Sequence, residues 1–259
     1  VGKDEYIKGM WCVPKYSNPE GITYSDEVVD RLAKMKTAAG DFRILWDNAY
    51  VVHHLYEEHD NLKNMLLACK EAGNPDRVFM YASTSKITFP GAGVAAMAAS
   101  ENNIKHIRKR MLRQTIGPDK LNQLHHVMFL KDMGNIREHM KKHAAILRPK
   151  FKTVLDMLEK ELGGKNIAWW SNPRGGYFIS LNTMPGCAKK VVEKAAEAGV
   201  IVTPAGATFP YGKDPEDRNI RIAPTFPPLH ELEEAMELIC ICIQLVSIEK
   251  ILALRNGDS

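Results

Sequence analysis

The sequence VFMYASTSK, residues 78–86, joins an apolar segment to a group of hydroxyl residues and a lysine. Its first four residues are typical of a buried strand, and the polar residues mark the loop in which that strand ends. A lysine attacks an aldehyde only as a neutral amine, and proteins lower its pKa by desolvation or by nearby positive charge. Lys86 follows Ser83 and Ser85, so this turn offers hydroxyl donors for a phosphate next to an amine. On local chemistry alone, a solvated surface lysine is the more common interpretation.

Strands and helices alternate over the first half of the chain. We predict strands at residues 9–14, 42–46 and 78–81, a helix capped by Ser25, and a second helix at residues 62–72. This alternation favours an α/β fold with a mostly parallel sheet. Ligands of such sheets bind at the carboxyl ends of the strands. Asn18, Asp47 and Lys86 each come just after a predicted strand, so we expect them at that edge.

The second half of the chain predicts a smaller α+β domain. Strand-like segments cover residues 167–170, 176–181, 200–203 and 220–223, and helical segments cover residues 188–198 and 229–254. A long charged helix at residues 135–162 precedes them. We therefore predict residues 1–134 to be the C-terminal portion of a large domain, and residues 135–259 to be the linking helix and a small domain.

The composition is that of an ordinary globular protein, since 45% of the 259 residues are hydrophobic and 25% are charged. The net charge of +4 is small and dispersed, which gives no indication of nucleic-acid binding. No run of about 18 apolar residues predicts a membrane span. Five widely spaced cysteines are interpreted as free thiols in a reducing cytoplasm. The chain begins without Met and enters an apolar strand at once, so we expect it to be a piece of a longer protein.

Five short motifs give the chain a family resemblance. Ser83-Thr84-Ser85-Lys86 resembles the S-x-S-K Schiff-base motif of class I and II aminotransferases, which are pyridoxal-phosphate (PLP) enzymes of fold type I. Asn18-Pro19-Glu20-Gly21 resembles their N-P-x-G loop, and Asp47-Asn48-Ala49-Tyr50 resembles their D-x-A-Y segment. Gly175-Gly176-Tyr177-Phe178 is similar to the G-G-x-F strand of their small domain, and Asn219-Ile220-Arg221-Ile222-Ala223 is similar to the segment that carries their substrate-binding arginine. The flanking sequence looks most like bacterial aspartate aminotransferases of the MocR-like subgroup.

The resemblance implies an α/β protein of PLP fold type I, with the PLP-binding large domain incomplete at its N-terminus. It also implies transfer of an amino group between an amino acid and a 2-oxo acid, in a homodimer with pyridoxal 5'-phosphate as the cofactor. Aspartate and 2-oxoglutarate are the substrates that the subgroup similarity suggests.

The resemblance assigns the cofactor's reactive groups to four residues. Lys86 would carry PLP as a Schiff base and then move the proton between the substrate Cα and the cofactor. Asp47 would pair with the pyridine nitrogen and keep it protonated. Tyr50 and Asn18 would hydrogen-bond the phenolic oxygen. Without the resemblance, a helix N-cap is the preferred interpretation of Asp47, and Asn18 is typical of a turn.

The resemblance assigns the phosphate and the substrate to further residues. Ser83 and Ser85 would contact the phosphate. Arg221, together with Asn18, would bind the substrate α-carboxylate through a bidentate pair. Many members of the family have a phosphate-binding arginine a few residues after the lysine, but residues 88–94 contain none. The phosphate charge must then be balanced by a helix N-terminus or by the partner subunit.

Other functions share these sequence features. Some transcription regulators of the MocR type fuse a DNA-binding module to an aminotransferase-like domain, and such a module would lie upstream of this chain. A PLP lyase or decarboxylase on the same fold is a closer alternative. The pairs His53-His54 and His125-His126 are adjacent in sequence and point apart on a helix, so we predict no metal site.

Overall fold

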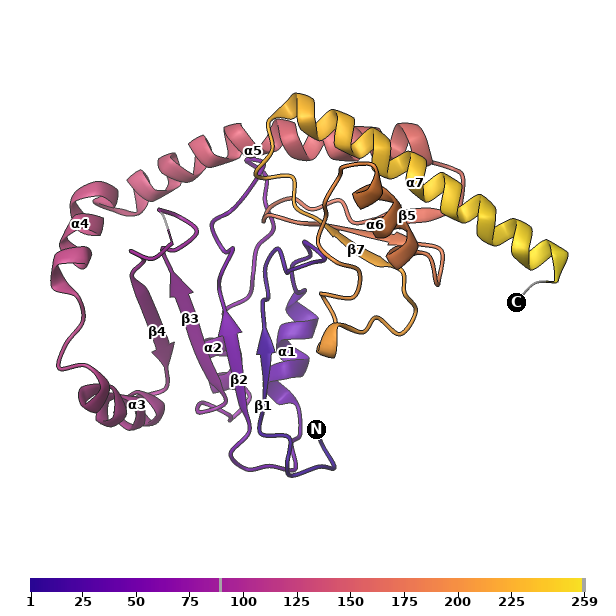
Figure 1. Ribbon diagram of the computed structural model, residues 1–259. Coiled ribbons are helices and arrows are strands. Elements are labelled where there is room, and N and C mark those ends of the chain that lie inside the picture. Colours follow the sequence, from indigo (N-terminus) through magenta and orange to yellow (C-terminus); the bar gives the residue numbers. More distant parts are fainter. Residues whose placement is uncertain (89, 258–259) are drawn as a thin grey trace. The chain divides into compact units, whose positions relative to one another are not determined.

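The computed structural model describes residues 1–88 and 90–257, and these residues form two compact units (Figure 1). Unit 1 consists of residues 1–17, 22–54 and 58–142. Unit 2 consists of residues 18–21 and 55–57 and the described residues from 143 onward. The domain boundary predicted after residue 134 stays a prediction about the complete protein.

Unit 1 is built on a four-stranded sheet in the order β1-β2-β3-β4. The strands are β1 (Gly9–Cys12), β2 (Arg43–Asp47), β3 (Val78–Ser83) and β4 (Ala95–Ala99). The first three are parallel, as expected, and β4 is antiparallel to β3, so the sheet is mixed. Asp47 pairs with Tyr81 in the register, which places the carboxyl ends of β2 and β3 side by side.

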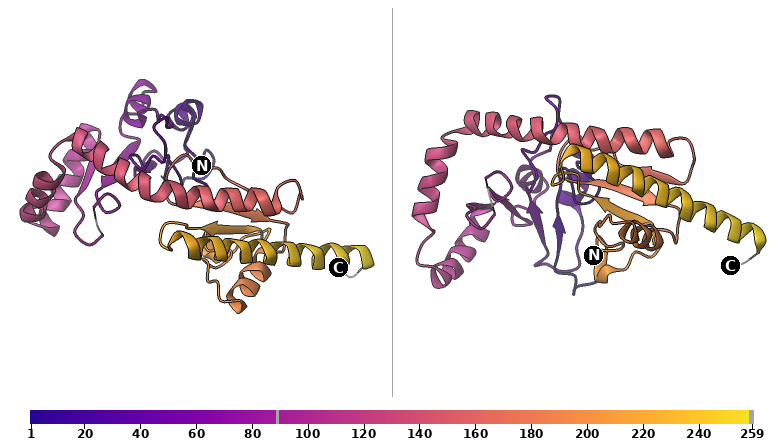
Figure 2. Two further views of the ribbon diagram at one scale, coloured as in Figure 1. Left: turned by 90° about the horizontal axis from the view of Figure 1, so that it is seen from above. Right: turned by 45° about the horizontal axis from the view of Figure 1, so that its top comes forward.

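Two helices cover one face of this sheet (Figure 2). They are α1 (Asp26–Lys34) and α2 (Met65–Glu71). Trp46 of β2 is fully buried in the same apolar cluster as Val29 of α1 and Met65 of α2. Ser25 caps α1, as predicted, and α2 begins later than predicted because Asn64 accepts the capping hydrogen bond there.

Three helices follow β4 in the chain. They are α3 (Glu101–Gln114), α4 (Lys120–Leu130) and α5 (Met133–Leu162). α3 and α4 belong to unit 1, whereas α5 belongs to unit 1 only up to Lys142 and to unit 2 from His143 onward. The helix predicted at residues 135–162 is confirmed as α5. α4 carries large apolar side chains that are each more than half exposed: Leu121, Leu124, Val127, Met128 and Phe129.

Unit 2 contains a three-stranded antiparallel sheet in the order β5-β6-β7. Its elements after α5 are β5 (Ala168–Trp170), β6 (Ile179–Thr183), α6 (Ala188–Glu197), the short 3-10 helix η1 (Pro210–Gly212), β7 (Asn219–Ile222) and α7 (Leu229–Asn256). Leu181 of β6 and its register partner Ile220 of β7 are buried in one cluster with side chains of α5, α6 and α7. The predicted α+β organisation of this half is confirmed.

Two strand predictions in this half differ from the structure. Residues 200–203 are not a strand, although their β-branched sequence favours one. A strand needs a hydrogen-bonded neighbour, and no described segment forms a ladder with these residues. The strand predicted from Gly176 begins at Ile179, because Gly176 has a φ of +81° that an extended strand does not accommodate.

Two general expectations also meet the structure. All five cysteines are buried free thiols, as predicted. No helix in the described part of the chain is long and apolar enough to cross a membrane.

Candidate active site

Lys86 lies in the loop that joins β3 to β4. The loop is closed at its base by Thr84, whose amide donates to the Val94 carbonyl oxygen at 2.9 Å. In return the Val94 amide donates to Thr84 Oγ1 at 2.8 Å. Lys86 therefore sits on a short, hydrogen-bonded turn at the carboxyl end of β3, where the sequence predicts it.

The amine of Lys86 lies over the ring of Tyr50. Nζ is 5.2 Å from the ring centroid, within the range of a cation–π contact. Tyr50 is buried in the turn that follows β2, and His53 from the same turn packs against it edge to face. The structure thus brings together the two residues that were predicted to hold the reactive carbonyl carbon and the phenolic oxygen of one cofactor.

Ser83 and Ser85 lie on either side of Thr84, and the Ser83 hydroxyl accepts a hydrogen bond from the Ser85 amide at 3.4 Å. Gly93 lies so close to Ser85 that position 93 has no room for a side chain. A Cβ at Gly93 would lie 2.5 Å from Ser85 Oγ and 3.2 Å from its backbone nitrogen, closer than these atoms tolerate. Gly93 therefore leaves the room that the Ser85 hydroxyl occupies.

Asp47 is the last residue of β2 and is half-buried. Because successive side chains of a strand alternate between the faces of a sheet, Asp47 lies on the face opposite to buried Trp46. Tyr81, its register partner, is on this face and stacks on the ring of Trp11, with centroids 6.3 Å apart. Trp11 is 63% exposed, so the face that carries Asp47 is open in unit 1.

The other predicted residues belong to unit 2. Arg221 Nη1 donates to Asn18 Oδ1 at 3.1 Å, and Nη2 donates to Thr203 Oγ1 at 3.4 Å. The guanidinium lies 4.8 Å from the ring centroid of Phe178. Arg221 Nε is buried and has no hydrogen-bond partner among the described residues. Nη1 and Nη2 therefore donate to uncharged oxygens, and the N–H group of Nε has no acceptor among the described residues.

A polar network fixes the loop that contains Asn18. Ser180 donates to the carboxylate of Glu20 at 2.9 Å and accepts from the side-chain amide of Asn219 at 2.8 Å. Ser180 and Asn219 are almost fully buried. Ser180 is the register partner of Arg221, so this network and the guanidinium share one face of the small sheet. Gly21 closes the loop with a φ of +68°, and a Cβ there would lie 2.5 Å from Pro173 Cβ.

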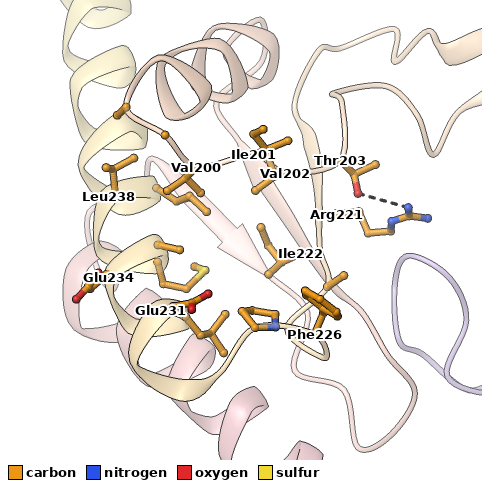
Figure 3. Close-up of a pocket in the computed structure, with 18 residues that line it drawn as sticks. Val200, Ile201, Val202, Thr203, Arg221, Ile222, Phe226, Glu231, Glu234 and Leu238 are labelled. Atoms are coloured by element: carbon orange, nitrogen blue, oxygen red, sulfur yellow. Dashed lines mark hydrogen bonds between the residues drawn. The ribbon is translucent and has the colours of Figure 1, made fainter.

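Arg221 also lines a pocket of about 640 Å³ in unit 2. Figure 3 shows Arg221 and Thr203 at one end of this pocket and Leu238 at the other. Most of the wall is apolar, with Val200, Val202 and Ile222 exposed to it. The Arg221 end offers hydrogen-bond donors that suit a carboxylate, whereas Glu231 and Glu234 add negative charge elsewhere along the wall.

A separate group of titratable side chains lies in unit 1. Tyr16 Oη and His54 Nδ1 share a hydrogen bond of 2.8 Å, and the His54 ring stacks on His59 at 3.7 Å. Burial lowers the pKa of His54 to about 4, and the positive charges of Lys15 and His59 add to this effect. Burial also lowers the pKa of Lys15, against the opposing effect of Asp60. His54 is therefore neutral near pH 7.

Comparison with known families identifies the family of this chain. The family model described as aspartate amino-transferase matches residues 1–255. The chain belongs to the aspartate aminotransferase family. It is 50% identical to a putative aminotransferase of Mycolicibacterium smegmatis over 97% of this chain and 59% of that protein.

Solved structures agree with the aminotransferase fold. An aspartate transaminase of Corynebacterium glutamicum is 45% identical, with a TM-score of 0.94 over 96% of this chain and 59% of that one. The α-aminoadipate aminotransferase of Thermus thermophilus, solved with N-(5'-phosphopyridoxyl)-L-leucine, shares the fold at 21% identity and a TM-score of 0.74 over 91% of this chain and 58% of that one. This aminotransferase-family chain thus spans about three fifths of the length of these relatives.

The residues present fit PLP. An amine, a tyrosine ring and two serine hydroxyls meet around one turn, and Gly93 keeps the space of the Ser85 hydroxyl open. Residues 88–94 supply no arginine, and Phe89 among them lies outside the described residues. The source of positive charge for the phosphate stays a prediction.

Sequence reasoning missed several residues of this site. His53, His126 and His139 all contact the loop of Lys86. His53 and His126 were considered only as metal ligands, and the prediction that His53-His54 lie on a helix is wrong, because the chain turns there between β2 and α2. Ser180 was not singled out, and Glu20 was read only as part of a motif. The partners lie far apart in the sequence, so no local pattern identifies them.

Proposed function

We propose that this protein is a PLP-dependent aminotransferase that moves an amino group between aspartate and 2-oxoglutarate. The observation that carries the proposal is the Lys86 amine, held 5.2 Å over the Tyr50 ring on a turn rich in hydroxyls. Family membership supports the reaction class, and the similarity to an aspartate transaminase supports the substrate pair.

Lys86, Tyr50 and Asp47 would hold the reactive part of the cofactor. Lys86 Nζ would bind the aldehyde carbon and afterwards carry a proton to and from the substrate Cα. Asp47, on the open face of β2, would accept a hydrogen bond from the pyridine N–H with its carboxylate and so keep that nitrogen protonated. The Tyr50 hydroxyl would donate to the phenolic oxygen. When bound, PLP supplies the electron sink that a protein side chain lacks.

Ser83 and Ser85 would anchor the phosphate. Each contributes one hydroxyl to the turn of Lys86, and the absence of a side chain at Gly93 leaves room for the Ser85 hydroxyl. Hydroxyl donors bind phosphate oxygens but add no charge, so this anchor is weaker than one that includes an arginine.

Arg221 would bind the α-carboxylate that all amino donors share. Its buried Nε has no partner among the described residues, and a carboxylate oxygen would supply one. Asn18, which already accepts from Nη1 at 3.1 Å, would keep the guanidinium oriented and contribute its own amide to the substrate. The fork geometry of arginine suits two carboxylate oxygens better than a point charge does.

We also propose that the protein is a homodimer. The exposed apolar side chains of α4, among them Phe129 and Met128, form the kind of surface that subunit interfaces cover. Sedimentation of the complete protein would give twice the chain mass. A monomer at all concentrations would contradict this proposal.

The function is tested by assaying the complete protein with PLP against a panel of amino donors and 2-oxo acids. We expect the largest kcat/KM for aspartate with 2-oxoglutarate and no turnover by the Lys86→Ala variant. Release of carbon dioxide or ammonia without amino transfer would indicate a lyase or decarboxylase instead. Turnover that survives Lys86→Ala would refute the role of this lysine.

A further inference from the structure

Three histidines from separate segments contact the turn that carries Lys86. His53 follows β2, His126 lies in α4 and His139 lies near the start of α5. Their ring nitrogens reach backbone or hydroxyl oxygens of residues 84–88 at distances from 2.8 to 3.1 Å. Such convergence on one short turn is specific, because only nine histidines occur in the chain.

Two of the rings satisfy carbonyl groups that the turn itself leaves open. Two amides of the turn donate to the Thr84 carbonyl oxygen at 2.9 Å, which makes one turn of helix. The last carbonyls of a helical turn have no amide partner within it. Here the Lys86 carbonyl oxygen accepts from His53 Nε2 at 2.9 Å, and the Ile87 carbonyl oxygen accepts from His139 Nε2 at 2.8 Å. A carbonyl oxygen only accepts, so both rings carry a proton on Nε2.

The third ring ties the two ends of the loop together. His126 Nδ1 donates to the Asn122 carbonyl oxygen at 2.9 Å, which leaves Nε2 of the neutral ring as an acceptor. Nε2 lies 2.9 Å from Thr84 Oγ1 and 3.1 Å from Thr88 Oγ1. Since Thr84 Oγ1 also accepts from the Val94 amide at 2.8 Å, one hydroxyl joins α4 to both ends of the loop.

We propose that His53, His126 and His139 are positioning residues that hold the Lys86 amine in place for the reaction. His53 has a double role, because its amide donates to the Tyr50 carbonyl oxygen at 3.0 Å while its ring holds the Lys86 carbonyl. The inference rests on the proposed function for the claim that Lys86 carries the cofactor. Small displacements of a reacting group are costly, so a residue that fixes the turn affects the rate without touching the substrate.

The test uses backbone hydrogen exchange of the complete protein without cofactor, read by mass spectrometry over residues 84–94. Each of the three histidines is replaced by Leu, which removes the ring nitrogens, and in a second set by Gln, which keeps a side-chain amide. His125→Leu is the matched control, because His125 is the exposed neighbour of His126 on α4.

We expect each Leu variant to raise exchange in this segment about fivefold, the effect of one lost hydrogen bond. The Gln variants should recover part of the protection, and His125→Leu should leave it unchanged. A Leu variant that raises exchange throughout β1–β3 is loosened as a whole, and the Gln variant at the same position is then compared instead. Protection of residues 84–94 in that Gln variant close to the protection in the original protein supports the proposal. Exchange that stays the same in all three Leu variants, or Gln variants no better protected than a globally loosened Leu variant, would overturn it.

A kinetic readout separates this inference from the proposed function. In the loaded protein, kcat should fall about fivefold or more in each Leu variant, while KM for the amino donor changes by less than about twofold. A rise in KM of about fivefold with kcat unchanged would overturn the positioning role. If the unaltered protein shows no cofactor on Lys86, the proposed function fails, whereas the exchange result still decides whether the histidines hold the turn.

Discussion

Replacing Arg221 by lysine should weaken every amino donor to a similar extent. The guanidinium holds Asn18 Oδ1 at 3.1 Å and Thr203 Oγ1 at 3.4 Å, and its buried Nε is left for the substrate. A lysine ammonium keeps the charge but cannot reach these two oxygens and a carboxylate from one fixed plane. The variant therefore loses at least one hydrogen bond to a charged group.

A hydrogen bond to a charged partner is worth about 1.5–3 kcal/mol, which corresponds to a loss of roughly 10- to 150-fold in kcat/KM. We expect most of this loss in KM, because the α-carboxylate is bound both before and during the reaction. Steady-state kinetics of the complete protein with three or more amino donors would measure it.

Arg218→Lys provides the matched control on the segment just before Arg221. Arg218 pairs with Glu216 through Nη1 at 2.5 Å and lies 3.9 Å from the Trp169 ring centroid, and its Nε, like that of Arg221, is buried without a partner among the described residues. The control should leave KM unchanged for all donors. If Arg221→Lys also leaves every KM unchanged, the carboxylate-binding role of Arg221 is wrong.

Four further changes test other parts of the site. Asp47→Asn should retain PLP but lower the rate on the order of 10²-fold or more in single-turnover assays, because the pyridine nitrogen loses its negative partner; near-normal rates would contradict this. Tyr50→Phe keeps the ring under the Lys86 amine but loses one hydrogen bond, so PLP titration should show about fivefold weaker binding, and unchanged affinity would reject the hydroxyl's role. Gly93→Ala brings a Cβ to 2.5 Å from Ser85 Oγ, so fluorescence titration should show weaker PLP binding, and equal binding would show that the loop adapts. The pKa of His54 is lowered to about 4 in the folded protein, so the unfolded chain binds more protons between about pH 6.5 and pH 4. The free energy of unfolding should therefore fall as pH falls through this window. Urea unfolding of the His54→Asn variant should show a smaller fall, and a pH dependence identical to that of the original protein would contradict the assignment.

Strand ends and caps were predictable because local chemistry determines them. Ser25 begins a helix since its hydroxyl accepts an amide of the first turn, and this requires only nearby residues. The apolar runs that end at Asp47 and Ser83 likewise predicted where polar side chains would emerge. The sequence gives no comparable signal for β4, because the sequence AAMAA has low strand propensity and is held by pairing with β3.

The contacts that orient the site residues depend on tertiary structure. Ser180 and Glu20 are 160 positions apart, yet their side chains hydrogen-bond at 2.9 Å. His139 lies 52 positions after the carbonyl that it holds. Residues 200–203 show the reverse case, in which a strong local preference for a strand is not realised because no described neighbour pairs with it. Motifs therefore predicted which residues would carry the chemistry, and packing determines what holds them.

The central claim is that Lys86 binds PLP covalently, and borohydride reduction of the complete protein tests it most directly. Protein incubated with PLP is reduced, digested and analysed by peptide mass spectrometry. We predict that the peptide that contains Lys86 gains the mass of a pyridoxyl-phosphate group, and that the corresponding peptide of the Lys86→Ala variant does not. A stable adduct on a different lysine, or no adduct on any peptide, would contradict the account.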